Sequence, residues 1–163
     1  MSSQSRRTIR TATVIGAVSL GLIALSACEK PTPRATATVG STTISTEASC
    51  YDDGKTIPQD EVRKCLSKKS EKTISVGTGE KLRIGVEPDM AENGWLVFVN
   101  GQPALPDPVK KTYYSFPGEA FFQSQSAQGQ PSAPKKTAQI SIVEADGSDF
   151  KGVWHLKLKN DNG

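Results

Sequence analysis

The chain has 163 residues, which allows one ordinary domain with tails but hardly two full domains. Hydrophobic residues make up 36% and charged residues 23%, which excludes a wholly disordered chain and fits a small, loop-rich domain. The formal net charge of +3 comes from Arg6, Arg7 and Arg10, because removing them from the 20 basic residues leaves 17 against 17 acidic ones. These arginines lie in a segment that we expect to be cleaved off, so the charge does not indicate nucleic-acid binding.

Residues 1–27 have the order of a secretory signal peptide, with an arginine-rich start, an apolar stretch and small residues at the end. The apolar stretch, residues 12–25, is about fourteen residues long, shorter than the roughly 20 that a membrane-spanning helix needs. The segment Leu25–Cys28 has the form of a bacterial lipobox. It predicts cleavage before Cys28 and a diacylglyceryl thioether on its thiol, to which an N-acyl chain such as palmitate can be added.

The export route stays open between two alternatives. Residues 5–10 (SRRTIR) are similar to a twin-arginine signal, but Arg10 stands where that pattern has an apolar residue, so the general secretory route is also open. Either route delivers the chain to the extracytoplasmic face of the cell membrane. Residues 28–35 contain Pro31 and Pro33, which favour an extended tether of about 20 Å between the lipid and the domain.

Cys50 and Cys65 remain once Cys28 is lipidated, and an even pair in an exported protein indicates a disulfide. Free thiols and a metal site are the alternatives. A metal site needs more thiol or imidazole ligands than the chain offers, since His155 is its only histidine. We therefore expect a disulfide, no metal and no cofactor beyond the acyl chains.

Period-two alternation of apolar and polar residues runs through the rest of the chain and predicts strands. In the last strand Trp154, Leu156 and Leu158 are expected to face the core, and His155 to face solvent. Asn100-Gly101 is a hairpin signal leading into residues 102–105. We expect strands over 36–44 with a break at Gly40, 73–76, 81–87, 95–99 as a central strand, 112–116, 120–123, 137–145 and 152–159, a helical turn over 59–64, and a mobile loop over 123–136.

Seven to nine short strands over residues 36–159 predict an all-β domain, an immunoglobulin-like β-sandwich, with a small barrel as the alternative. Residues 160–163 are expected to form a disordered tail.

The chain combines three features: the lipobox Leu25–Cys28, the stretch Ser49-Cys50-Tyr51 after a Thr-rich strand, and Val86-Glu87-Pro88-Asp89 leading through Asn93-Gly94 to Trp95. Together they resemble a family of small actinobacterial envelope lipoproteins with a domain of unknown function. The resemblance covers most of residues 36–158. It implies an exported, sandwich-like domain, and it brings no catalytic residue with it.

The sequence carries no strong signal for an enzyme. A hydrolase needs a nucleophile with a base in reach, and His155, the sole imidazole, is expected to face solvent. The acidic pairs at 52–53, 60–61 and 146–149 lack the spacing of a calcium loop and fit turns, and no glycine-rich phosphate-binding pattern is present. We therefore expect a non-catalytic protein.

Aromatic residues near 113–122 are the candidate contact surface. Alternation places Tyr113 and Tyr114 on opposite faces of a strand, so that one of them, with Phe121 nearby, is a candidate contact for a peptide or a glycan. The lysine pairs at 68–69, 110–111 and 135–136 are candidates for contact with lipid headgroups or wall polymers, but they are scattered and balanced by acidic residues, which favours a solvated surface.

Two functions follow from these observations. The first is a lipid-anchored, non-catalytic binding or adaptor domain that contacts an envelope protein or a wall polymer. The second is a structural envelope lipoprotein without a dedicated ligand. An exposed aromatic patch favours the first, and a uniformly polar surface favours the second.

Overall fold

The fold is that of a computed structural model, which describes residues 31–125 and 131–161. The predicted signal peptide, Cys28 and the last two residues of the expected tail lie outside these ranges. Asn160, placed in the tail by the sequence, instead ends a strand.

A first layer of the sheet forms around the amino-terminal hairpin, β1 (Arg34–Val39) and β2 (Thr42–Tyr51). Alternation buries Ala35, Ala37 and Val39 on one side of β1 and leaves threonines on the other. The other edge of β1 pairs antiparallel with β4 (Lys81–Val86), and β4 pairs with β7 (Tyr113–Pro117). The break expected at Gly40 is therefore the turn of a hairpin.

A second layer forms around the carboxy-terminal hairpin, β10 (Thr137–Asp146) and β11 (Asp149–Asn160). β10 also pairs with β5 (Trp95–Val99), and β5 turns at Asn100-Gly101 into the short β6 (Gln102–Pro103). β3 (Thr73–Val76) runs parallel to β11. The hairpin predicted at Asn100-Gly101 and the strands expected over 137–145 and 152–159 are confirmed, but β5 lies second from the edge of the sheet rather than at its centre.

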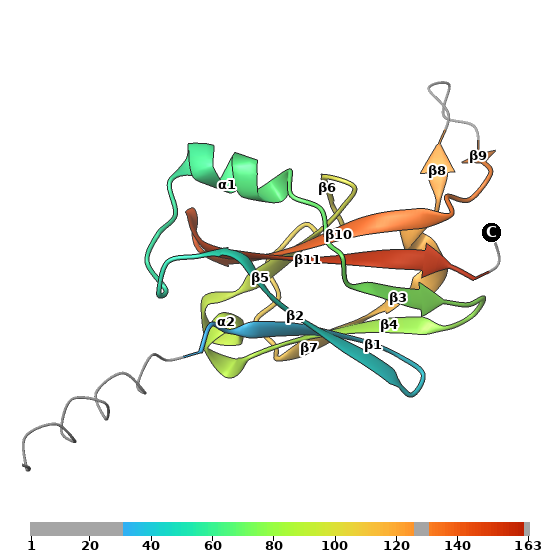
Figure 1. Cartoon of the computed structure of the whole chain (residues 1–163), viewed down its shortest axis with the longest axis horizontal. Coiled ribbons are helices and arrows are strands. Elements are labelled where there is room, and N and C mark those ends of the chain that lie inside the picture. The colour runs from blue at the N-terminus through green and yellow to red at the C-terminus, as the bar shows by residue number, and fades with distance from the viewer. Residues whose placement is uncertain (1–30, 126–130, 162–163) are drawn as a thin grey trace, which may run out of the picture. The chain divides into compact units, whose positions relative to one another are not determined.

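β2 joins the two layers. Its first half, up to Glu47, pairs with β1, and its second half, from Ala48 to Tyr51, pairs with β11. The strand order is therefore continuous, β6-β5-β10-β11-β2-β1-β4-β7, in one sheet that curls around its own inner face (Figure 1). This arrangement confirms the predicted all-β, sandwich-like fold.

The core lies between the two layers and combines inward residues of both. Trp154, Leu156 and Leu158 are fully buried there, as the alternation in the last strand predicts. The other large side chains of this core with no exposed surface are Trp95, Leu82, Ile84, Met90, Ile140 and Ile142.

Three local elements differ from the prediction. The expected strand over 120–123 is wrong: the 3-10 turn η1 (Gly118–Phe121) occupies its first two residues, and the other two are not in a strand. The backbone at Gly118 lies close to the backbone of Glu80, so that a Cβ at position 118 would be only 2.7 Å from the carbonyl oxygen of Glu80. A short helix, α2 (Pro88–Asn93), was not predicted. The expected loop over 123–136 contains the paired short strands β8 (Ser124–Gln125) and β9 (Pro131–Ser132).

The helix α1 (Gln59–Leu66) extends the predicted helical turn and packs on the outer face of the second layer (Figure 1). Its buried residue Cys65 contacts Val143 and Val153, and these three form a second apolar cluster. Because of this cover, β10 and β11 are buried on both faces along part of their length. The expectation that His155 faces solvent is therefore wrong: it is 1% exposed.

Candidate functional site

Two tyrosines on β7 are the only large hydrophobic side chains that are exposed in the described part of the chain. Tyr113 is 59% exposed and Tyr114 is 37% exposed. Strand alternation places them on opposite faces, as predicted. The ring of Tyr114 packs on the core residue Phe116 with centroids 4.7 Å apart, whereas Tyr113 lies on the outer face of the first layer beside β4. Tyr113 is thus the more accessible aromatic surface.

Phe121, the third residue of the predicted contact surface, is not available for contact. It lies in η1, is only 3% exposed, and its ring centroid is 5.3 Å from that of Phe116. The turn that replaces the expected strand directs this ring into the core. The prediction is therefore wrong for Phe121.

A shallow groove runs beside Tyr113 on the outer face of the first layer. We call it the Tyr113 groove, and its lining consists of Thr36 and Thr38 from β1, Arg83 and Gly85 from β4, and Tyr113 from β7. The floor is made of short side chains. At Gly85 a Cβ would lie 2.6 Å from Oγ1 of Thr36, so a larger residue would displace that threonine and fill the groove.

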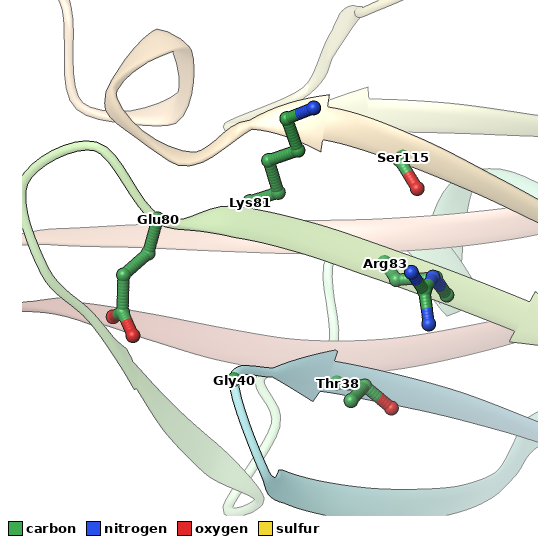
Figure 2. A pocket seen from close by; sticks show the side chains of 6 residues that line it. All are labelled: Thr38, Gly40, Glu80, Lys81, Arg83 and Ser115. Carbon is green, nitrogen blue, oxygen red and sulfur yellow. The ribbon is translucent and has the colours of Figure 1, made fainter.

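Arg83 is the central charge of the groove. Its guanidinium carbon lies 5.8 Å from the centroid of the Tyr113 ring, which is within the range of a cation–π contact. Arg83 also lines the adjoining hollow with Lys81 and Ser115 (Figure 2). Within the described residues Arg83 has no acidic partner. The carboxylate of Glu80, also in this hollow, accepts a 2.7 Å hydrogen bond from the backbone N–H of Gly77.

β7 is the last strand of the sheet on this side. Within the described ranges it pairs only with β4. Alternate residues of an antiparallel edge strand direct their N–H and C=O groups away from the neighbour, where they can pair with an added strand. The groove therefore adjoins a backbone edge that suits an extended peptide.

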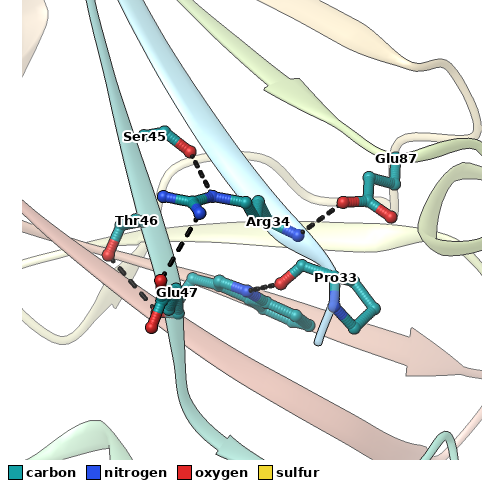
Figure 3. A network of polar contacts seen from close by, with 7 residues as sticks. Pro33, Arg34, Ser45, Thr46, Glu47 and Glu87 are labelled. Atoms are coloured by element: carbon teal, nitrogen blue, oxygen red, sulfur yellow. Dashed lines mark hydrogen bonds and ion pairs between the residues drawn. The ribbon is translucent and has the colours of Figure 1, made fainter. Parts of the chain in front are cut away.

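The start of β1 is fixed to its neighbours by Arg34 (Figure 3). Its backbone N–H donates to Oε1 of Glu87 at 2.9 Å, and its Nε donates to Oγ of Ser45 at 2.9 Å. The guanidinium also lies 3.4 Å from Glu47. Pro33, directly before it, is already buried. Any tether to Cys28 therefore ends at Pro33, two residues earlier than the sequence suggested.

Cys50 on β2 and Cys65 on α1 form the predicted disulfide, with their Cα atoms 6.0 Å apart. The bond fixes α1 to the second layer. Among residues 31–125 and 131–161, no group of three or more His, Cys, Asp or Glu side chains could hold a metal ion.

His155 connects the helix and the sheet beneath it. Its Nε2 lies 2.8 Å from the carbonyl oxygen of Cys65, and its Nδ1 lies 3.0 Å from Oγ of Ser141. A carbonyl oxygen only accepts, so Nε2 donates, and Nδ1 of the neutral ring accepts from the hydroxyl. Burial lowers the pKa of His155, which favours this neutral form. Ser141 is only 4% exposed, and we interpret the pair as a structural link.

Glu144 is a second buried titratable group, 3% exposed, on the inner side of β10. Its Oε1 accepts a 2.6 Å hydrogen bond from Nδ2 of Asn93 on α2, while Oε2 is buried without a partner within the described residues. Burial raises the pKa of this carboxyl group.

Sequence reasoning found Tyr113 but missed the residues that surround it. Arg83, Thr36 and Thr38 are at outward positions of two predicted strands, so alternation alone gives their orientation. Their meeting with Tyr113 depends on the pairing of β1 with β4 and of β4 with β7, which one sequence does not specify.

Comparison with known proteins finds no matching family model, and no curated protein or solved structure is significantly similar to the chain. The resemblance to actinobacterial envelope lipoproteins stays a prediction. Among the described residues no helix is long and apolar enough to cross a membrane.

Proposed function

We propose that this protein is an extracytoplasmic lipoprotein, anchored by acyl chains on Cys28, whose folded domain is a non-catalytic binding module for an envelope protein. The Tyr113 groove and the adjoining edge of β7 form the contact surface. The observation that carries the proposal is that Tyr113, on the edge strand β7, is 59% exposed and lies beside Arg83.

The chemistry of this surface favours a protein partner. An exposed tyrosine and an arginine are the residue types that most often dominate the energy of protein interfaces. The backbone edge of β7 can pair with an extended segment, while Arg83 attracts an acidic or amide side chain on that segment. A wall polymer would use the same aromatic surface but would not need the free edge.

The proposed anchor sets where the partner lies. Four residues, 29–32, separate Cys28 from the buried Pro33. At about 3 Å per extended residue they span about 12 Å, less than the 20 Å expected from the sequence. The module would therefore work close to the bilayer and meet partners that are themselves in or near the membrane.

The anchor is tested by fractionation. Cys28→Ser should remove the protein from the membrane fraction, because the residue that would carry all of the anchoring acyl chains is lost. A variant that still sediments with membranes would contradict the lipoprotein proposal.

The binding surface is tested by crosslinking intact cells and quantifying what co-purifies. We expect the double variant Arg83→Gln/Tyr113→Ala to lower recovery of one abundant protein at least about tenfold, since each residue type contributes more than about 1 kcal/mol at interface centres. The control is Lys55→Gln/Lys64→Gln, which removes two exposed charges elsewhere. Capture of a wall polymer in place of a protein would contradict the protein partner and indicate a polymer ligand. Capture of nothing reproducible would favour the alternative, a structural envelope lipoprotein.

A further inference from the structure

The outer face of the second layer is covered by α1 over only part of its length. Pairs of residues on β10 and β11 follow one another along this face: Val143 with Val153, Ser141 with His155, then Gln139 with Lys157. The helix covers the first two pairs and ends at Leu66. Beyond its end the face is open and forms a cleft of about 500 Å³, which we call the lysine cleft.

The described residues that line the lysine cleft carry only positive charge. They include Lys68, Lys69 and Lys157 and no aspartate or glutamate. Lys68 is engaged elsewhere, because its Nζ donates to the carbonyl oxygen of Ser49 at 2.8 Å. Lys69 and Lys157 take part in none of the ion pairs within the described ranges. Two cations are therefore available to a ligand.

A buried donor without a partner lies in the same cleft. Nε2 of Gln139 is shielded from solvent and has no hydrogen-bond partner among the described residues. Its backbone is fixed, because the N–H of Gln139 donates to Oδ1 of Asn100 at 3.0 Å. A buried amide that lacks an acceptor is unfavourable, so an oxygen supplied by a ligand would remove this cost.

The carboxy-terminal end of α1 lies near the cleft and by itself would repel an anion. Its last carbonyl oxygens, however, already accept hydrogen bonds: that of Lys64 from the hydroxyl of Ser67 at 2.7 Å, and that of Cys65 from the N–H of Lys68 and from His155. This capping reduces the negative potential that the helix presents.

We propose that the lysine cleft is a binding site for a phosphate group, held by the ammonium groups of Lys69 and Lys157 and by the side-chain amide of Gln139. Three donors from two strands and a loop suit a tetrahedral oxyanion, and lysines bind phosphate as point charges. The phosphate can belong to a lipid headgroup or to a small soluble molecule. The site lies on the opposite layer from the Tyr113 groove and does not depend on it.

The test uses the full-length lipidated protein in maltoside micelles, with inorganic phosphate titrated at constant ionic strength. Binding is followed by nuclear magnetic resonance of the Gln139 side-chain amide. In the wild type we expect a saturable change in the chemical shift of this amide. In Lys69→Gln/Lys157→Gln the Kd should be about tenfold higher, as expected when a charge-assisted contact worth about 1.4 kcal/mol is lost. Gln139→Leu, followed through the backbone amide of residue 139, should also bind more weakly. The control Lys55→Gln/Lys64→Gln should bind as the wild type does.

A second titration with glycerol phosphate distinguishes the source of the ligand. Tighter binding of glycerol phosphate than of inorganic phosphate would indicate a lipid headgroup, and equal or weaker binding a free phosphate. The proposal is overturned if neither compound moves the Gln139 amide, or if the control variant loses as much affinity as Lys69→Gln/Lys157→Gln.

Discussion

The indole N–H of Trp154 donates a 2.8 Å hydrogen bond to the carbonyl oxygen of Pro33, 121 residues earlier in the chain. Trp154 has no exposed surface and lies in the core between the two layers. A buried indole N–H requires an acceptor, and the start of the folded domain supplies it. The point at which the proposed tether meets the domain is therefore part of the core.

Substitutions of Trp154 test this connection. Trp154→Ala should lower the free energy of unfolding by about 3 to 5 kcal/mol through loss of core packing. Trp154→Phe retains most of the apolar surface but leaves the carbonyl of Pro33 without its donor, and should cost about 1 to 3 kcal/mol. Urea unfolding monitored by circular dichroism measures both. An unchanged midpoint in Trp154→Ala would contradict the strand register.

The disulfide is expected to stabilise the fold through α1. The double variant Cys50→Ala/Cys65→Ala should lose about 3 kcal/mol of unfolding free energy, because the bond closes a loop with a sequence separation of 15. Urea unfolding without reductant compares the variant with the disulfide-bonded wild type, and wild-type protein measured in the presence of reductant is the control. Peptide mapping that finds both thiols alkylated in the native protein would refute the bond.

The sequence predicted most strands because alternation reports burial directly, as in Leu82, Ile84 and Val86 on β4. Alternation also oriented His155 correctly toward the outer face. It did not predict that His155 is buried, because the helix that covers this side chain, α1, is distant from it in sequence. Cys65 carried the missing signal: its disulfide to Cys50, on the strand beside β11, requires the helix to lie over this part of the sheet.

Other features were beyond single-sequence reasoning. The change of partner within β2 coincides with a register shift in its pairing with β11, which no local pattern encodes. Phe121 was placed in a strand because it is aromatic, but the preceding Pro117-Gly118 turns the chain into η1. The Tyr113 groove depends on strand order, so only its tyrosine could be predicted.

The burial of His155 predicts a dependence of stability on pH. Its folded-state pKa lies below the unfolded value near 6.5, so the unfolded chain binds the proton first as the pH falls. The contribution of neutral His155 to the free energy of unfolding is fully present above about pH 6.5, and it declines as the pH falls through that value toward the folded pKa. In the wild type, the free energy of unfolding measured from pH 8 to pH 5 should fall with this slope as the pH is lowered. The slope should be reduced in His155→Gln, and an identical slope in both proteins would contradict the prediction.

Glu144 is expected to act with the opposite sign. Its raised pKa means that the folded state keeps the proton above 4.5, so its contribution to stability is lost as the pH rises through the folded pKa. Glu144→Gln removes the buried charge and should raise the free energy of unfolding at pH 7, with a smaller effect near pH 4. The same unfolding assay at the two pH values measures this difference. A variant less stable at pH 7 would indicate that the carboxylate is favourable.

Contact between the outer face of the first layer and a protein partner can be tested by site-specific photo-crosslinking in intact cells. In one variant a benzophenone side chain replaces Tyr113, and in a second it replaces Lys55, which is exposed and does not line the groove. We expect one abundant protein adduct from position 113, weakened by Arg83→Gln and absent from position 55. Equal adducts from both positions, or none from position 113, would contradict the proposed contact surface.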